Sequence, residues 1–343
     1  MAQIGPSGIR SDIIQHTMHR AIVISIFSLA AYLSVTPLDA QSGSWIKVST
    51  NGTPTARHEA AFVEVSGKLY LLGGRGMKPV DIFDPQSNGW STASGPPVEM
   101  HHFQPVVHDG RIVAASVFTG GYPHETPLPN VMIYDPASDE WSEGPAIPEG
   151  RRRGAAGEVL DGDKLYLVGG IIDGHYAGTV PWLDVLDLNT GKWTQLPDAP
   201  QARDHFQAAL IGGKIYAAAG RRTSAKTNET FTLTVPETDV FDIESRTWST
   251  VAPIPTMRAG TSSLALNGKL VVAGGESGAH ETAHAEVEVF DPAAGTWRSL
   301  PNLVQGRHGT GMTYFDGKLW TAAGSGNRGG RPELDTFEAL SAP

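Results

Sequence analysis

The stretch LYLLGG at residues 69–74, followed by VDIFDP at 80–85 and by Trp90, is the first of six similar stretches in this 343-residue chain. The apolar run recurs as IVAAS at 112, LYLVGG at 165, IYAAAG at 215, LVVAGG at 270 and LWTAAG at 319. The second segment recurs as VMIYDP at 131, LDVLDL at 183, TDVFDI at 238, VEVFDP at 287 and LDTFEA at 334. Copies that start 43 to 55 residues apart predict one supersecondary unit per copy.

Short runs of β-branched and aromatic residues, broken by Gly, Asn, Asp and Pro, make up each copy and predict β-strands. A tryptophan follows the second segment in the first five copies, at Trp90, Trp141, Trp193, Trp248 and Trp297. With these elements the pattern resembles the kelch repeat, in which each copy is one blade of a β-propeller. The resemblance implies an all-β fold, a six-bladed kelch β-propeller with four antiparallel strands per blade.

The last copy ends at Pro343, without room for an outer strand that carries a tryptophan. Trp45, in the segment GSWIKVS, precedes the first copy and supplies the missing sixth tryptophan. In kelch propellers one end of the chain completes the last blade, which removes two open sheet edges. The sequence therefore predicts that the N-terminal strand around Trp45 closes the ring.

The second copy is the most divergent. Its apolar run ends in Ser116 and Val117 in place of the glycine pair, and Gly120 and Gly121 follow four residues later. Its VMIYDP segment and Trp141 are in place. We therefore count it as a blade.

The first 40 residues carry a different pattern. Arg20 precedes the apolar run AIVISIFSLAAYLSV, and TPLDA ends the segment at Ala40, as is typical of a secretory signal. The run is short for a bilayer span. We expect residues 1–40 to be a signal peptide, with Met18 as an alternative start, and residues 41–343 to be a single propeller domain. The mature protein would be periplasmic or secreted, with no membrane span after cleavage.

Composition excludes several classes of partner and cofactor. Removal of residues 1–40 takes away two basic and two acidic residues, so the formal net charge stays at -10, which argues against a nucleic acid partner. The chain has no cysteine, so it forms no disulfide. It also lacks the cysteine-linked tyrosine of the copper radical oxidases that resemble galactose oxidase. We expect a monomer without a cofactor.

Strand direction places the long loops and the starts of the innermost strands on one face and the tight turns on the other. Five copies begin the innermost strand with arginine: Arg57, Arg153, Arg203, Arg258 and Arg307. Nine of the twelve histidines also fall on this long-loop face. In an acidic chain this arrangement favours an anionic ligand. A structural role for the arginines, bonding between blades, is the alternative.

Two segments of this face carry candidate chemistry. In RDHFQ at 203–207, Asp204 and His205 are adjacent, so their direct pairing requires an irregular strand start. His205 could then act as a general acid or base. The segment GGESGAHETAH at 274–284 resembles the bacterial periplasmic kelch enzymes that epimerise sialic acid (N-acetylneuraminate), whose site includes a Glu just after a Gly. Glu276 matches that position, while Thr282 stands where the family has arginine.

The sequence thus predicts a small anionic ligand, a sugar acid or oligosaccharide, bound on the long-loop face, with epimerase- or mutarotase-type proton transfer as an extension. The candidate catalytic residues are Glu276, His205 and Asp204. The candidate ligand-binding residues are Arg57, His58, His102, Arg153, His175, Arg203, Arg222, His284, Arg307, His308 and Arg328. The alternative is a protein-interaction module that recognises an acidic peptide or an envelope partner through the same face.

No metal is expected, because no histidine spacing in the chain is specific for one. His280 and His284 stand four residues apart, a useful spacing only on a helix, and their loop has no helical pattern. Histidines from different blades that converge on copper or zinc are an alternative that the sequence leaves open.

Overall fold

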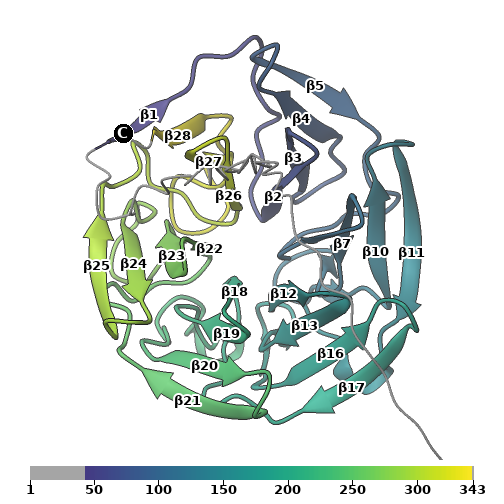
Figure 1. The fold of residues 1–343 in the computed structure, drawn as a ribbon, viewed down its shortest axis with the longest axis vertical. Coiled ribbons are helices and arrows are strands. Elements are labelled where there is room, and N and C mark those ends of the chain that lie inside the picture. The colour runs from purple at the N-terminus through teal and green to yellow at the C-terminus, as the bar shows by residue number, and fades with distance from the viewer. Residues whose placement is uncertain (1–42, 342–343) are drawn as a thin grey trace, which may run out of the picture. The chain divides into compact units, whose positions relative to one another are not determined.

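The computed structural model describes residues 43–341, and the predicted signal peptide at 1–40 lies outside them. Six antiparallel sheets of four strands follow one another around a ring (Figure 1). The predicted six-bladed propeller is therefore confirmed. No helix among the described residues has the length and apolar character that a membrane span requires.

The strands fall into six blades. Blade 1 holds β2 (Ala60–Val65), β3 (Lys68–Gly73), β4 (Val80–Asp84) and β5 (Gly89–Ala93); blade 2 holds β6 (Val106–His108), β7 (Arg111–Ala114), β10 (Asn130–Asp135) and β11 (Glu140–Ala146). Blade 3 holds β12 (Gly157–Asp161), β13 (Lys164–Val168), β16 (Leu183–Asp187) and β17 (Lys192–Leu196); blade 4 holds β18 (Ala208–Ile211), β19 (Lys214–Ala217), β20 (Thr238–Asp242) and β21 (Thr247–Val251). Blade 5 holds β22 (Ser262–Leu266), β23 (Lys269–Ala273), β24 (Val287–Asp291) and β25 (Thr296–Leu300); blade 6 holds β26 (Met312–Phe315), β27 (Lys318–Ala322), β28 (Phe337–Ser341) and β1 (Trp45–Lys47).

The loops of the long-loop face contain the remaining elements. Two small hairpins pair β8 (Phe118–Thr119) with β9 (Thr126–Pro127) and β14 (Ile171–Asp173) with β15 (Ala177–Thr179). Two single 3-10 turns, η2 (Glu149–Arg151) and η3 (Ala225–Thr227), complete the list.

The ring closes through β1, as predicted. This strand pairs antiparallel with β28, and Trp45 lies opposite Leu340, just as Trp90 lies opposite Phe83 in blade 1. Trp45 is only 4% exposed, whereas the other five blade tryptophans are half-buried. Trp45 therefore packs more completely than any of its five counterparts.

The third strand of blade 6 differs from the prediction. The repeat pattern placed it at LDTFEA, residues 334–339, but β28 spans Phe337–Ser341, a shift of three residues. The register explains the shift, because Leu319 pairs with Leu340 as Leu69 pairs with Phe83. The last residues that the structure describes, Phe337–Ser341, are therefore part of the sheet.

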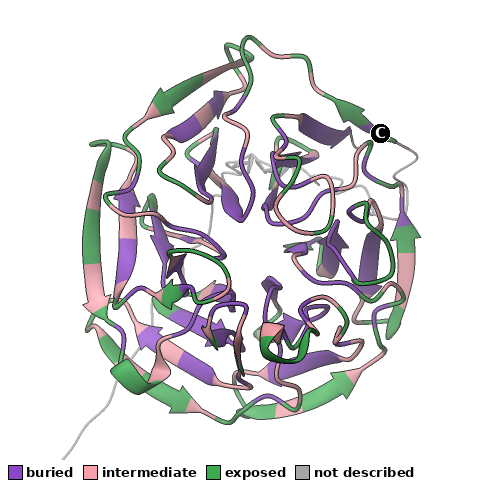
Figure 2. Cartoon of the chain, turned by 180° about the vertical axis from the view of Figure 1, so that it is seen from behind, coloured by how far each residue is buried: buried purple, intermediate pink, exposed green. Residues whose placement is uncertain are grey.

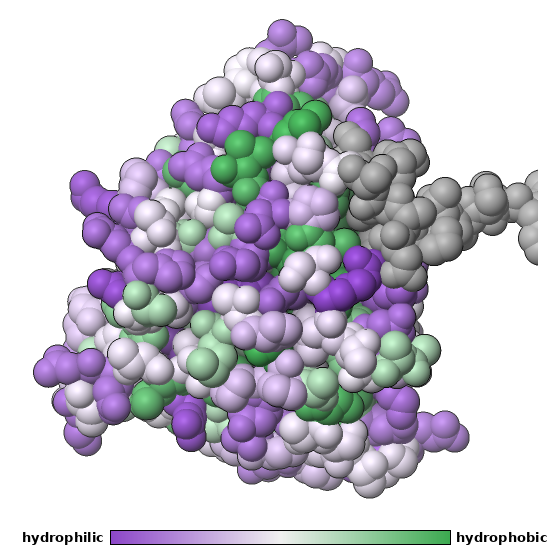
Figure 3. Space-filling model, turned by 90° about the vertical axis from the view of Figure 1, so that its left-hand side faces the viewer, coloured by the Kyte–Doolittle hydropathy of each residue, from purple (hydrophilic) through white to green (hydrophobic). Residues whose placement is uncertain are grey.

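The hydrophobic core lies in layers between neighbouring blades. The inner strands are buried and the outermost strands are largely exposed (Figure 2). Aromatic pairs cross these layers, such as Tyr70 and Tyr134 of blades 1 and 2, whose ring centroids are 6.4 Å apart. The side of the molecule drawn in Figure 3 is mostly hydrophilic, with hydrophobic residues in small groups. Polar outer strands discourage pairing with other chains.

A buried carboxyl group compensates for the divergence of blade 2. The Glu158 side chain on β12 accepts hydrogen bonds from the backbone N–H groups of Ala115 and Ser116, where the other copies end in small residues. Ser116 Oγ in turn accepts from the N–H of Ala156. Burial raises the pKa of Glu158 to about 8, although these amide bonds and Arg153 favour its ionised form.

Substitution of the closing tryptophan, Trp45→Ala, is expected to lower the free energy of unfolding by about 3–5 kcal/mol, as for a buried large aromatic. Urea denaturation followed by circular dichroism measures this loss. Trp193→Ala is the matched control, because Trp193 is half-buried in blade 3, whose four strands come from one continuous stretch of the chain. This variant should lower the free energy of unfolding by less. Equal losses for both variants would place the closing contact elsewhere.

Glu158→Gln is expected to change how stability depends on pH. The pKa of Glu158 is higher in the folded chain than its ordinary 4.5, so the folded state binds the extra proton and stability falls as pH rises from about 4.5 to about 8. The amide does not titrate, so the variant gains stability relative to wild type across this window. Urea titrations at both ends of the window test this, with exposed Glu140→Gln as control. A constant difference between variant and wild type would contradict the assignment.

Candidate functional site

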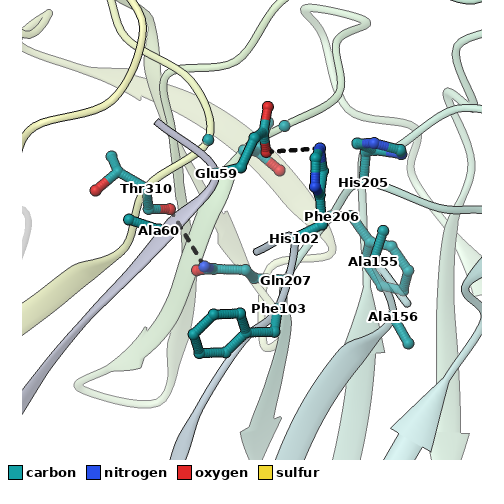
Figure 4. Close-up of a pocket in the computed structure, with 13 residues that line it drawn as sticks. Glu59, Ala60, His102, Phe103, Ala155, Ala156, His205, Phe206, Gln207 and Thr310 are labelled. Atoms are coloured by element: carbon teal, nitrogen blue, oxygen red, sulfur yellow. Dashed lines mark hydrogen bonds and ion pairs between the residues drawn. The ribbon is translucent and has the colours of Figure 1, made fainter. Parts of the chain in front are cut away.

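Six residues, one at the start of each blade's innermost strand, form a closed ring of backbone hydrogen bonds around the centre of the propeller. We call this ring the collar; its members are Glu59, His102, Ala155, His205, Gly260 and Gly309. The N–H of each later member donates to the carbonyl of the one before it over 2.6–3.0 Å, and the N–H of Ala60 closes the ring on the carbonyl of Gly309 at 3.1 Å. The six collar residues all line one small cavity at the centre (Figure 4).

Every collar residue adopts left-handed backbone angles, with φ between 53° and 65°. This conformation costs energy for residues with a Cβ, so the closed ring of hydrogen bonds must hold it in place. At His205 it supplies the irregular strand start that pairing with its neighbour requires. Asp204 Oδ1 lies 2.5 Å from His205 Nδ1.

The five arginines that begin the innermost strands lie inside the blades, at most 2% exposed. Each pairs with a carboxylate on the third strand of its own blade: Arg57 with Asp81, Arg153 with Asp184, Arg203 with Asp239, Arg258 with Glu288 and Arg307 with Glu338. Each also donates to the carbonyl 16 residues further along the chain. These arginines therefore have a structural role, as in the alternative that the sequence left open, but they bond within their own blades and not between blades. The ligand role predicted for Arg57, Arg153, Arg203 and Arg307 does not fit this burial.

A cavity of about 530 Å³ lies on the long-loop face beside the collar. We call it the loop-face pocket; it is lined by His58, Glu59, Arg75, His102, Tyr122, His175, Phe231, Glu276, Arg328, Gly329, Gly330 and Arg331. Glu59 and His102 also line the central cavity, together with Phe103, Phe206 and Gln207 (Figure 4). The side chains of Glu59 and His102 therefore lie between the two cavities.

Three buried histidines from blades 2, 3 and 4 meet at the collar. His205 Nε2 lies 3.1 Å from His175 Nε2, and the ring centroid of His102 lies 5.0 Å from those of both. One ring nitrogen of each residue lies within 4.8 Å of the others. Burial lowers the pKa of His102 and of His205 below the ordinary value, and nearby Arg221 lowers that of His205 further. The lowered pKa values of His102 and His205 favour neutral imidazole, the form that binds metal ions.

Two carboxylates continue the network. Glu59 Oε2 lies 3.2 Å from His102 Nε2, Glu59 Oε1 lies 3.7 Å from His308 Nδ1, and Glu276 Oε2 lies 3.4 Å from His308 Nε2. Burial opposes ionisation of Glu276, but His308 and Arg221 outweigh it and lower its pKa to about 2. Glu276 is therefore ionised at neutral pH and has no proton to donate there.

The remaining predicted residues divide between the pocket and its surroundings. His58 lines the pocket and its Nδ1 lies 2.8 Å from Glu333 Oε1. Arg328 is an exposed residue on the rim. Arg222 is exposed and does not line the pocket, and His284 is bonded to Ser277 and Glu286 outside it.

The site also contains residues that were not among the predicted ones, including Glu59, Glu125, Arg221 and Arg331. Glu59 had a usable signal, because it occupies the same place in the repeat as His102 and His205, two residues after the arginine position. Glu125, which lies 2.8 Å from His175 Nδ1, comes from an irregular loop before β9 and has no counterpart in the repeat. Its position depends on how that loop folds.

Comparison with known proteins supports this architecture. The sequence model of the KLHDC2/KLHL20/DRC7 Kelch-repeats domain matches residues 117–324, more than half of the chain. The chain belongs to the kelch-repeat family. A kelch propeller is compatible with binding either a small ligand or a protein.

Among curated proteins, the Kelch-like protein terF of Aspergillus terreus (strain NIH 2624 / FGSC A1156) is 28% identical to this kelch chain over 260 residues, which cover 70% of this chain and 54% of terF. Alpha-scruin of Limulus polyphemus is 26% identical over 65% of this chain and 24% of its own length. Kelch-like protein 36 of Mus musculus is 26% identical over 68% of this chain and 37% of its own length. The chain spans about half or less of the length of these relatives.

Among solved structures, YjhT superposes with a TM-score of 0.70 and 15% sequence identity, covering 84% of this chain and 95% of that one. At this identity the likeness shows the fold alone. The superposition extends over nearly all of the YjhT chain, so two very different sequences adopt the same propeller fold.

Arg307→Met is expected to lower the free energy of unfolding by about 3–5 kcal/mol, because it leaves Glu338 charged and buried without its cationic partner, with only the N–H groups of Val304 and Gln305 as donors. Chemical denaturation measures the loss. The double variant Arg307→Met, Glu338→Met removes both charges and should recover most of it. If Arg307→Met alone unfolds like wild type, the internal ion pair is not what keeps this arginine in place.

Proposed function

We propose that this kelch propeller binds a small anionic ligand of the sugar-acid class in the loop-face pocket. The observation that carries the proposal is the pair of exposed guanidinium groups on the pocket rim, Arg328 and Arg331. Within residues 43–341 neither of them forms an ion pair, in contrast to the five arginines inside the blades and to Arg75, which pairs with Glu125. Unpaired guanidinium groups suit a carboxylate, which they can bind with two parallel hydrogen bonds.

The pocket walls fit a sugar-sized molecule. Tyr122 is 59% exposed, so its ring is open to a sugar, while histidines and carboxylates lie deeper. The ring of Phe231 lies under the guanidinium groups of Arg221 and Arg328, with which it makes cation–π contacts. Small-ligand sites combine apolar walls with a few directed polar groups in this way. The pocket volume of about 530 Å³ is also within the range of such sites.

The epimerase-type extension of this proposal rests on Glu276. Its carboxylate is ionised, as a general base requires, but it is held by Arg221 Nη1 at 2.5 Å and by the N–H of Gly329 at 2.8 Å. A pKa of about 2 makes it a weak base. We therefore propose ligand binding as the function, with Glu276 as an electrostatic element of the pocket. We also propose export, on the signal-like pattern of residues 1–40.

The double variant Arg328→Ala, Arg331→Ala is expected to bind an anionic sugar at least about tenfold more weakly than wild type, because charge-assisted hydrogen bonds are lost. Isothermal titration calorimetry with N-acetylneuraminate and glucuronate, and with neutral N-acetylglucosamine for comparison, measures this. Arg222→Ala is the matched control, an exposed arginine outside the pocket lining.

Three outcomes would count against the sugar-acid proposal. These are that wild type binds no anionic sugar, that it binds the neutral sugar equally well, and that Arg222→Ala loses as much affinity as the rim variant. An acidic peptide that binds wild type and competes at the rim, where the sugars do not, would favour the protein-interaction function instead.

A further inference from the structure

The histidine cluster at the collar has a proton arrangement that follows from its hydrogen-bond partners. Asp204 accepts from the hydroxyl of Thr179, the N–H of Thr223 and the hydroxyl of Thr223, so it acts as a fully bonded acceptor. The His205 Nδ1 that faces it at 2.5 Å must therefore carry the proton. In a neutral imidazole this leaves a bare lone pair on His205 Nε2.

His175 is held in the same tautomer. Its Nδ1 lies 2.8 Å from Glu125 Oε1, and Glu125 also accepts from the backbone N–H of His175 and pairs with Arg75. The carboxylate offers no proton, so His175 Nδ1 donates and His175 Nε2 keeps a lone pair. The two Nε2 atoms lie 3.1 Å apart. Two lone pairs face each other at this distance.

The hydrogen bond between His102 and His101 gives His102 the same tautomer. His101 Nε2 lies 3.0 Å from the carbonyl oxygen of Gly120, an acceptor, so this nitrogen carries the proton and His101 Nδ1 must accept. His102 Nδ1, 2.6 Å away, therefore donates to it. His102 Nε2 is then a third bare lone pair. It is fully buried and has no hydrogen-bond partner within the described part of the chain, and the nearest charged atom is the acceptor Glu59 Oε2.

Three buried lone pairs that meet without a proton between them repel one another, and leaving a buried polar atom unsatisfied is costly. A cation at their centre removes both penalties. Two nitrogens bound tetrahedrally to one metal ion at about 2.1 Å each lie about 3.4 Å apart, close to the separation of His175 and His205 Nε2.

We propose that His102, His175 and His205 form a binding site for one divalent first-row transition metal ion, of the zinc or copper class, through their Nε2 atoms. Three imidazoles with no thiolate suit these ions rather than magnesium or calcium. His102 lines both cavities, His175 lines the loop-face pocket and His205 lines the central cavity. A fourth coordination position would therefore face open space, as in metal sites that act on a substrate.

The surroundings have the features of a prepared metal site. Asp204 and Glu125 orient His205 and His175 through Nδ1, which is the usual outer support of histidine ligands. Glu59 adds a negative charge 3.2 Å from His102 Nε2. These three acidic residues offset the charge of a buried cation. No sugar takes part in this arrangement, so the proposal of a metal site does not depend on the proposal of an anionic ligand.

The test uses the full chain without a polyhistidine tag, stripped with EDTA and titrated separately with Zn²⁺ and Cu²⁺. We expect one ion per chain by calorimetry and by elemental analysis after gel filtration, and a higher melting temperature with metal. The Cu²⁺ form should show nitrogen hyperfine splitting from imidazoles in its electron paramagnetic resonance spectrum. His175→Ala and His205→Ala should each abolish stoichiometric binding.

Two further variants keep the test decisive if the alanine variants fold poorly. Asp204→Asn preserves shape but removes the carboxylate that orients His205, and it should weaken binding about 10- to 100-fold. His284→Ala is the control, because His280 and His284 form a second pair whose ring centroids lie 4.4 Å apart away from the collar, and it should leave binding unchanged. Absence of a stoichiometric ion in wild type would overturn the proposal and indicate that the cluster holds a shared proton. Binding that survives Asp204→Asn unchanged, or is lost in His284→Ala, would overturn it as well.

Discussion

The closed ring of backbone hydrogen bonds at the collar is the constraint on which the rest of the site depends. Each blade contributes one residue in the left-handed conformation, and its carbonyl accepts a hydrogen bond from the next blade. A residue with a Cβ adopts this conformation at a cost, so the ring must be complete to hold all six. The same backbone turn points Glu59, His102 and His205 toward the centre and brings Asp204 against the side chain of its own neighbour.

The arginine–carboxylate pairs inside the blades are a second constraint, further from the centre of the propeller than the collar. Each arginine bonds to the end of the second strand and to a carboxylate of the third strand, and so fixes where the innermost strand of its blade starts. This accounts for a pattern that the sequence displays prominently and that has no direct part in ligand binding. Blade 2 has Met100 in place of the arginine. In this blade Glu158, from blade 3, accepts a hydrogen bond from the N–H of Ser116 at the end of the second strand.

The sequence allowed the blade count, the strand order and the closure through Trp45 to be predicted, because these depend on a repeat that tolerates local variation. The last blade was misplaced by three residues, because LDTFEA resembles the repeat more closely than the true strand does. The histidine cluster could not be predicted, since His102, His175 and His205 lie in three blades with no fixed spacing, and His175 comes from a loop whose path the repeat does not determine. The sequence predicted the Asp204–His205 pair only on the condition that the strand start is irregular. The left-handed backbone angle of His205 meets this condition.

The pairing of β1 with β28 bears on the order in which the ring assembles. Each of the first five blades is built from strands of one continuous stretch, whereas blade 6 joins strands from opposite ends of the described residues. Contacts so distant along the chain form late in folding. Five blades can therefore form while synthesis continues, whereas the sixth can form only after β28 has been synthesised. A chain interrupted before Phe337 would leave β27 and β1 with unpaired edges, which are sites of aggregation and cleavage. Strand β28, which lies between β27 and β1, therefore determines when the ring can close.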